Sequence, residues 1–129
     1  MEFFIARKLT GDSFESLTEK VKAELKNEGF GVITEIDIQK ILKEKINADF
    51  RKYLILGACN PHFAHRALMA EDKIGVLLPC NVVLQETKDG KFEVMAFDPA
   101  STMMEMDNPE LTELAADVRK KLGRVIDKL

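Results

Sequence analysis

The sequence predicts an α+β fold with two layers, in which helices pack on one face of a mainly antiparallel sheet, in the order β-α-β-α-β-α-β-β-α. Strand-like apolar runs alternate with stretches whose apolar residues recur at helical spacing, and an Asp89-Gly90 turn signal joins the last two strand-like runs as a hairpin. The chain of 129 residues has the length of one domain, so residues 1–129 are interpreted as a single domain.

The first two predicted elements are a strand over residues 2–9 and a helix that ends at about Glu28. Asp12 or Ser13 is the expected N-cap of this helix, and Glu15 follows Asp12 at the spacing of a capping box. Apolar residues at intervals of three and four predict one buried helix face, which comprises Phe14, Leu17, Val21 and Leu25.

The next elements are a strand over residues 30–36 and a shorter helix capped by Asp37. Residues 53–59, "YLILGAC", form an almost continuous apolar run, which is typical of a strand buried on both faces, with a buried helix start as the alternative. Asn60 is a favoured N-cap and Pro61 suits the first helical position, so we expect a third helix to begin there.

A long strand is predicted over residues 74–87, with an edge position, bulge or bend at Pro79, because proline cannot donate a hydrogen bond to a sheet. Asp89-Gly90 is interpreted as a two-residue turn, which places the returning strand over residues 91–98.

This turn length fixes a register for the hairpin. The strand pairs that it places opposite each other are Val82 with Phe97, Leu84 with Met95, and Asn81 with Asp98. Cys80 would then face the core together with Val82, Leu84, Met95 and Phe97. A one-residue bulge at Pro79 would instead turn Cys80 to the opposite face.

The C-terminal part is predicted to contain a loop and one long helix. Residues 99–108 form the expected loop, whose methionines at positions 103, 104 and 106 suit a subunit contact or the cover of a ligand cavity. Asn108-Pro109 repeats the Asn-Pro helix opening and predicts a helix to the C-terminus. Its apolar stripe comprises Leu111, Leu114, Val118, Leu122, Val125 and Leu129.

The composition argues against nucleic acid and membranes as partners. The formal net charge is -3, and lysines and arginines lie beside glutamates instead of forming a basic patch. No apolar stretch approaches the roughly 20 residues that a membrane-spanning helix needs. With two cysteines and no recognisable export signal, we expect a cytoplasmic protein with reduced thiols.

Two long motifs resemble the core of domain-of-unknown-function family 302 (DUF302). These are "ILGACNPHFAHRAL" (55–68) and "IGVLLPCNVVL" (74–84), followed by "DPAS" (98–101), and weaker similarity extends over nearly the whole chain. The resemblance implies a single-domain member with an arrangement of sheet and helices similar to that of the TATA-binding protein. It also implies a homodimer, but no established activity, ligand or cofactor.

We predict a small-ligand-binding module, not an enzyme, with a cleft between Cys59–Pro61 and Pro79–Asn81. The backbone N–H groups at the start of the third helix suit a phosphate or carboxylate ligand. The candidate ligand-binding residues are Gly57, Cys59, Asn60, His62, His65, Cys80, Asn81 and Asp98.

Three other interpretations of the same residues stay open at this point. In a purely structural one, Asn60 only caps a helix and Cys59 only packs, as free cysteines usually do. In a thiol redox enzyme or sensor, Cys59 would be the reactive thiolate at a helix start and Cys80 its resolving partner. A metal site would join both cysteines to one or both of His62 and His65, although this spacing matches no standard zinc signature.

Overall fold

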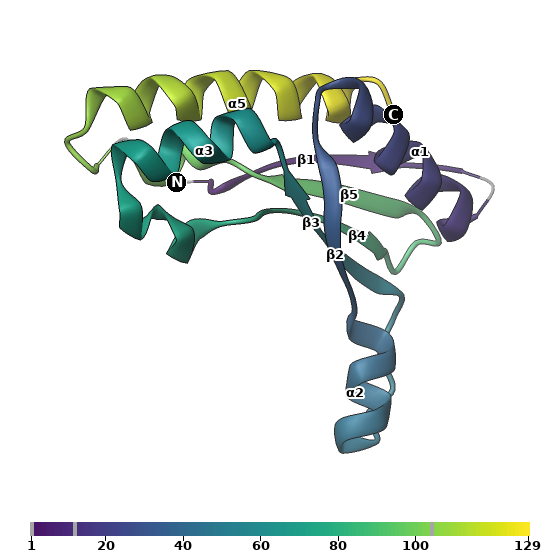
Figure 1. Cartoon of the computed structure of the whole chain (residues 1–129). Helices are drawn as coiled ribbons and strands as arrows, with labels where there is room; N and C mark the ends of the chain where they lie inside the picture. Colours follow the sequence, from purple (N-terminus) through teal and green to yellow (C-terminus); the bar gives the residue numbers. More distant parts are fainter. Residues whose placement is uncertain (1, 12, 104) are drawn as a thin grey trace.

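The computed structural model describes residues 2–11, 13–103 and 105–129, and these residues contain a five-stranded antiparallel sheet in the order β1-β5-β4-β3-β2. The strands are β1 (Phe4–Leu9), β2 (Gly31–Asp37), β3 (Tyr53–Cys59), β4 (Cys80–Glu86) and β5 (Phe92–Phe97). The helices are α1 (Phe14–Asn27), α2 (Ile38–Ile46), α3 (Pro61–Ala70), the 3-10 helix η1 (Asp72–Leu77), α4 (Pro99–Met103) and α5 (Pro109–Asp127). The predicted two-layer α+β fold is confirmed, with α1, α3 and α5 on the same side of the sheet (Figure 1).

Side-chain caps start the long helices where the sequence predicts them. Ser13 caps α1 and accepts a hydrogen bond from the Ser16 N–H, whereas Asp12 lies outside the described residues. Asn60 caps α3 and Asn108 caps α5, each followed by proline at the first helical position. Local hydrogen bonding therefore fixes where these helices begin, independently of the sheet.

The buried residues form two apolar clusters on the helical side of the sheet. In the larger one, α1 and the C-terminal half of α5 cover β3, β4 and β5, and it includes Val21, Leu56, Val82, Val94 and Leu122. The smaller one joins α3, η1 and α4 to the first turns of α5, and it comprises Ala67, Ile74, Met103, Leu111, Leu114 and Ala115. The helix α5 thus contributes to both clusters.

The predicted hairpin register is wrong by one residue. Val82 lies opposite Ala96, not Phe97, and Leu84 lies opposite Val94, not Met95. The turn is longer than predicted, because the Thr87 N–H donates to the Lys91 carbonyl and leaves three residues between them. Gly90 adopts a φ of 76°, the left-handed conformation that such three-residue loops place at their end.

Two further predictions in this region are wrong. Residues 74–77 belong to the 3-10 helix η1, and β4 begins only at Cys80, after a cis Leu78-Pro79 bond. The expected loop 99–108 contains the short helix α4 (Pro99–Met103). Met103 is buried in the smaller cluster and Met106 is exposed, while Met104 lies outside the described residues.

The strand β3 is buried on both faces only at its C-terminal end. Leu56, Gly57 and Ala58 are buried, whereas Tyr53 and Ile55 are partly exposed. Gly57 is covered on the face opposite the helices by the side chains of Thr34 and Pro79. The predicted burial of both strand faces is therefore correct for three residues of β3 and not for its whole length.

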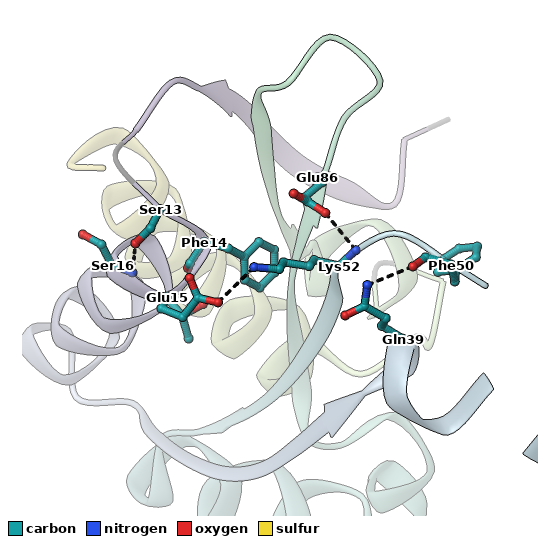
Figure 2. A network of polar contacts seen from close by, with 9 residues as sticks. Ser13, Phe14, Glu15, Ser16, Gln39, Phe50, Lys52 and Glu86 are labelled. Carbon is teal, nitrogen blue, oxygen red and sulfur yellow. Dashed lines mark hydrogen bonds and ion pairs between the residues drawn. The ribbon is translucent and has the colours of Figure 1, made fainter. Parts of the chain in front are cut away.

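The helix α2 projects from the ends of β2 and β3, away from the other helices (Figure 1). Its base is held by polar contacts that Figure 2 shows: Gln39 Nε2 donates to the Phe50 carbonyl at 2.9 Å. Next to it, Lys52 Nζ contacts Glu15 Oε1 at 3.0 Å, and the Lys52 N–H donates to Glu86 at 3.1 Å. These contacts tie the connection between α2 and β3 to α1 and β4.

Apolar side chains remain exposed on α2 and on the sheet face opposite the helices. None of the residues Ile38–Ile46, all of which the structure describes, is buried. The large exposed apolar side chains here include Phe3, Ile36, Ile41, Ile46 and Val76. The predicted homodimer stays a prediction, because a single chain does not test it.

Gly57→Ala is expected to destabilise the fold by about 2 kcal/mol, a typical cost of overpacking. A Cβ at Gly57 would collide with Thr34 Oγ1 and lie 2.9 Å from Pro79 Cγ. The matched control is Gly123→Ala in α5, where a Cβ meets no atom of the described residues within 4 Å and helix propensity predicts a gain of about 0.5–1 kcal/mol. Urea unfolding measures both, and equal effects of the two variants would contradict this account.

Candidate functional site

A cavity of about 230 Å³ lies between α3, α5 and the end of the sheet where β3 and β4 pair. The sheet side contributes Phe30, Ile33, Ala58, Cys59, Pro79 and Cys80. The helical side contributes Asn60, Phe63, Ala64, Ala67, Pro99, Met103, Leu114, Ala115 and Val118, and Leu78 completes the lining. The cavity therefore sits at the junction between the two apolar clusters of the core.

Small side chains create this space. Ala64 and Ala67 on α3 and Ala115 on α5 all line the cavity, and their methyl groups leave the gap between the two helices unfilled. Larger apolar residues, such as Phe63 and Met103, form the remaining wall. The short side chains at these three positions therefore account for the hollow between α3 and α5.

The cavity reaches the surface near the N-cap of α3. Cys59 and Asn60 are partly exposed, and Ile33 is 61% exposed although it lines the cavity. Ile33 is the extra residue of a β-bulge, because Val32 pairs with Ala58 and Thr34 pairs with Gly57. A bulge re-aims a side chain relative to regular alternation, and here it leaves an aliphatic side chain at the opening.

The structure brings three of the predicted site residues to this cavity, namely Cys59, Asn60 and Cys80. The pairing of Ala58 with Cys80 sets the end of β3 directly beside the start of β4. The segments on either side of the predicted cleft are therefore neighbours. The assignment of a ligand to these residues stays a prediction.

Other predicted site residues lie outside the cavity lining. His62 and His65 are exposed on α3. Gly57 pairs with Asn81, which is exposed and lines a second hollow of about 460 Å³ on the opposite face of the sheet.

The predicted pairing of Asn81 with Asp98 is wrong, since the register that sets Val82 opposite Ala96 would set Phe97, the last residue of β5, opposite Asn81. The Asp98 carboxylate makes two structural hydrogen bonds. Its Oδ1 accepts a hydrogen bond from the Ala100 N–H at 3.0 Å, and its Oδ2 accepts one from Arg119 Nε at 3.0 Å. This buried carboxylate fastens the start of α4 to α5.

Both cysteines are free, and burial controls the chemistry of one of them. Burial raises the pKa of the Cys80 thiol to about 11, and the electrostatic interaction with Cys59 adds to this effect. Cys80 is therefore a protonated, poorly nucleophilic thiol at neutral pH. Its predicted core-facing position beside Val82 and Leu84 is correct, but Met95 and Phe97 are not its neighbours on that face.

The predicted Cys/His metal site finds no support in the positions of these side chains. Within residues 2–11, 13–103 and 105–129, no group of three or more His, Cys, Asp or Glu side chains is placed to hold a metal ion. The two histidines are exposed on α3, whereas the two cysteines line the cavity.

Several residues that line the cavity are not among the predicted site residues. Phe63, Ala64 and Ala67 have the helical spacing of one face, which could have identified them as inward-facing residues of α3. The sequence around Ile33 gives no such indication, because the alternation of side chains along a strand does not show where a bulge inserts an extra residue. The lining residues of α5, Leu114 and Val118, were predicted as part of its core stripe but not as part of a site.

A comparison with family models matches residues 5–129 to "Domain of unknown function DUF302". The chain belongs to the DUF302 family. The crystal structure of an uncharacterized conserved DUF302 protein from Bacillus stearothermophilus is similar to it, with 30% sequence identity, a TM-score of 0.90, and coverage of 99% of this chain and 98% of that chain. No curated protein matches the chain.

The DUF302 resemblance expected from the two motifs is thus confirmed, and the similarity extends from the motifs to the whole fold. Neither description assigns an activity. Among the described residues, no helix is both long enough and apolar enough to cross a membrane.

Stability is expected to fall by up to about 3 kcal/mol as the pH rises from 9.0 to about 11, because of Cys80. In the unfolded chain the thiol ionises near its ordinary pKa of 9.0, whereas in the folded protein it stays protonated up to about 11. The contribution of Cys80 to the free energy of unfolding is therefore complete below pH 9.0 and is lost as the pH rises to about 11. In urea unfolding over this range, the free energy of unfolding should fall more steeply with pH for the native protein than for Cys80→Ala. Identical slopes would contradict the raised pKa.

Proposed function

We propose that this DUF302 domain binds a small molecule in the cavity between α3, α5 and the paired ends of β3 and β4. The observation that carries the proposal is the cavity itself: about 230 Å³ of apolar space beside a partly exposed N-cap. Ligand sites in proteins are typically concave, mostly apolar and equipped with few polar groups. This cavity has the same character on a smaller scale.

Packing energetics support an occupant. Where the hollow is empty, the lining side chains lack partner atoms on one side and lose the dispersion contacts that those atoms would supply. A bound apolar molecule would restore contacts with the lining side chains and would stabilise the folded state.

The lining favours binding over catalysis. Among the described residues that line the cavity, the polar side chain is Asn60, and the titratable groups are the thiols of Cys59 and Cys80. General acid–base chemistry uses a positioned histidine, carboxylate, lysine, tyrosine or cysteine, and of these groups only the two thiols line the cavity within the described residues.

Thiol redox chemistry is the second candidate, because Cys59 and Cys80 line the same cavity and the charge of one acts on the pKa of the other. The raised pKa of Cys80 opposes it, since a resolving thiol must itself attack as a thiolate.

Alkylation separates the two candidates. With iodoacetamide at neutral pH, Cys80 in the native protein is expected to react at least about a hundredfold more slowly than in urea, because its thiol is buried and protonated. Mass spectrometry of digested protein measures each site, and Cys59→Ser identifies the contribution of Cys80 alone. Rapid native reaction of Cys80, together with disulfide formation on peroxide treatment, would favour the redox candidate.

Ala115→Leu is expected to abolish ligand binding, because its added carbons occupy the gap between α3 and α5. The matched control is Ala116→Leu, the next residue of the same helix, whose side chain is exposed. The measurement is the thermal unfolding midpoint with a panel of small neutral, anionic and cationic molecules.

The proposal expects at least one panel molecule to raise the unfolding midpoint of the native protein and of Ala116→Leu, but not that of Ala115→Leu. Stabilisation that survives in Ala115→Leu would place the binding elsewhere. A panel without any effect on the native protein would contradict a binding function for this cavity.

A further inference from the structure

We infer that the ligand of this cavity is an uncharged, largely apolar molecule of about nine non-hydrogen atoms that presents one hydrogen-bond acceptor to Asn60. This inference rests on the proposed function and defines the chemical class of its ligand. It departs from the anionic ligand that the Asn-Pro helix start suggests.

The size follows from the volume. An engineered cavity of about 150 Å³ holds benzene, with six carbon atoms. In proportion, the cavity of about 230 Å³ accommodates about nine non-hydrogen atoms. A monosubstituted benzene ring with a short side group has this size, whereas a nucleotide or a sugar phosphate does not fit.

The lack of charge follows from the lining. No lysine, arginine, histidine or carboxylate side chain occurs among the described residues that line the cavity. An ion transferred into such an apolar space loses its hydration without gaining a partner of opposite charge. The thiols of Cys59 and Cys80 do not compensate, because a thiol supplies no positive charge in either protonation state.

The N-terminus of α3 does not supply an anion site either. Pro61 at the first position has no N–H to offer. The Phe63 N–H donates to Asn60 Oδ1 at 3.4 Å, and the Ala64 N–H donates to the Asn60 carbonyl at 2.9 Å. Of the N–H groups in this turn, only that of His62 is not used by these hydrogen bonds. A single N–H group binds an anion weakly compared with the several N–H groups at the start of a phosphate-binding helix.

Asn60 supplies the polar group at the opening. Its Oδ1 is engaged by the cap, so the Nδ2 group is the part of the amide that can turn to a ligand. Gly29, with φ at +87°, accommodates this amide, because a Cβ there would come within 3.0 Å of Asn60 Nδ2. As an N–H donor, Nδ2 selects a ligand with an acceptor such as a carbonyl oxygen.

Three probes of nearly the same size and shape test this class: acetophenone, benzoate and isopropylbenzene. They differ in the group on the ring, which is a carbonyl, a carboxylate or an alkyl group. Dissociation constants for the full chain are measured by titration followed by NMR, with Ala115→Leu as the blocked variant and Ala116→Leu as its control. Asn60→Ser keeps a capping oxygen but removes the Nδ2 donors.

We expect acetophenone to bind at least about tenfold more tightly than benzoate, since the anion is desolvated without compensation. Asn60→Ser should weaken the binding of acetophenone about two- to tenfold and leave the binding of isopropylbenzene unchanged, as expected for the loss of one hydrogen bond. A general loss of stability in that variant would affect both ligands alike.

The ligand class is overturned if benzoate binds more tightly than acetophenone. Provided that Ala115→Leu still blocks it, that outcome retains the cavity as a binding site. Equal weakening of acetophenone and isopropylbenzene in Asn60→Ser overturns the role of the amide. If none of the three probes binds, the ligand class is wrong, and the proposed function fails as well only when the broader panel also shows no effect.

Discussion

The pairing of β3 with both of its neighbours is the constraint on which the rest of this structure depends. Ala58 pairs with Val32 on one side and with Cys80 on the other, so the end of β3 is fixed within the sheet. Two residues after Ala58, Asn60 caps α3 and so fixes the residue at which this helix begins. The hydrogen bonds at the end of β3 and at the start of α3 therefore set where α3 lies relative to the sheet.

The long helix α5 then divides the core into two parts. Its later residues, Leu122 and Val125, pack with α1 over the sheet, whereas Leu111 and Leu114 pack with α3, η1 and α4. Asp98 ties the connection between the sheet and α4 to Arg119 near the middle of α5. Because α5 spans both clusters and α3 is fixed at its start, alanines at the junction leave space that neither helix can close. The cavity is thus a consequence of how the two clusters meet.

The same geometry gives different roles to two Cys-Asn dipeptides of the chain, Cys59-Asn60 and Cys80-Asn81. Cys80 opens β4 in an apolar environment, and burial keeps its thiol protonated. Asn60 satisfies the first turn of α3 and lies at the opening of the cavity. The motif residues of this DUF302 chain consequently serve the fold and the proposed site together, since the cap that begins α3 also forms the edge of the cavity.

Local features were predictable from the sequence by itself: the caps Asn60 and Asn108, a first cap at Asp12 or Ser13, the apolar stripes of α1 and α5, the fold class and the family. Each depends on residues a few positions apart, or on motifs that are long enough to be specific. The tertiary structure alone decided the hairpin register, the 3-10 helix before Pro79 and the outward turn of Ile33, because these depend on turn conformation and on packing against distant segments. It also decided the cavity, since a space between helices is set by the combined volume of side chains from remote parts of the chain, which no short pattern records.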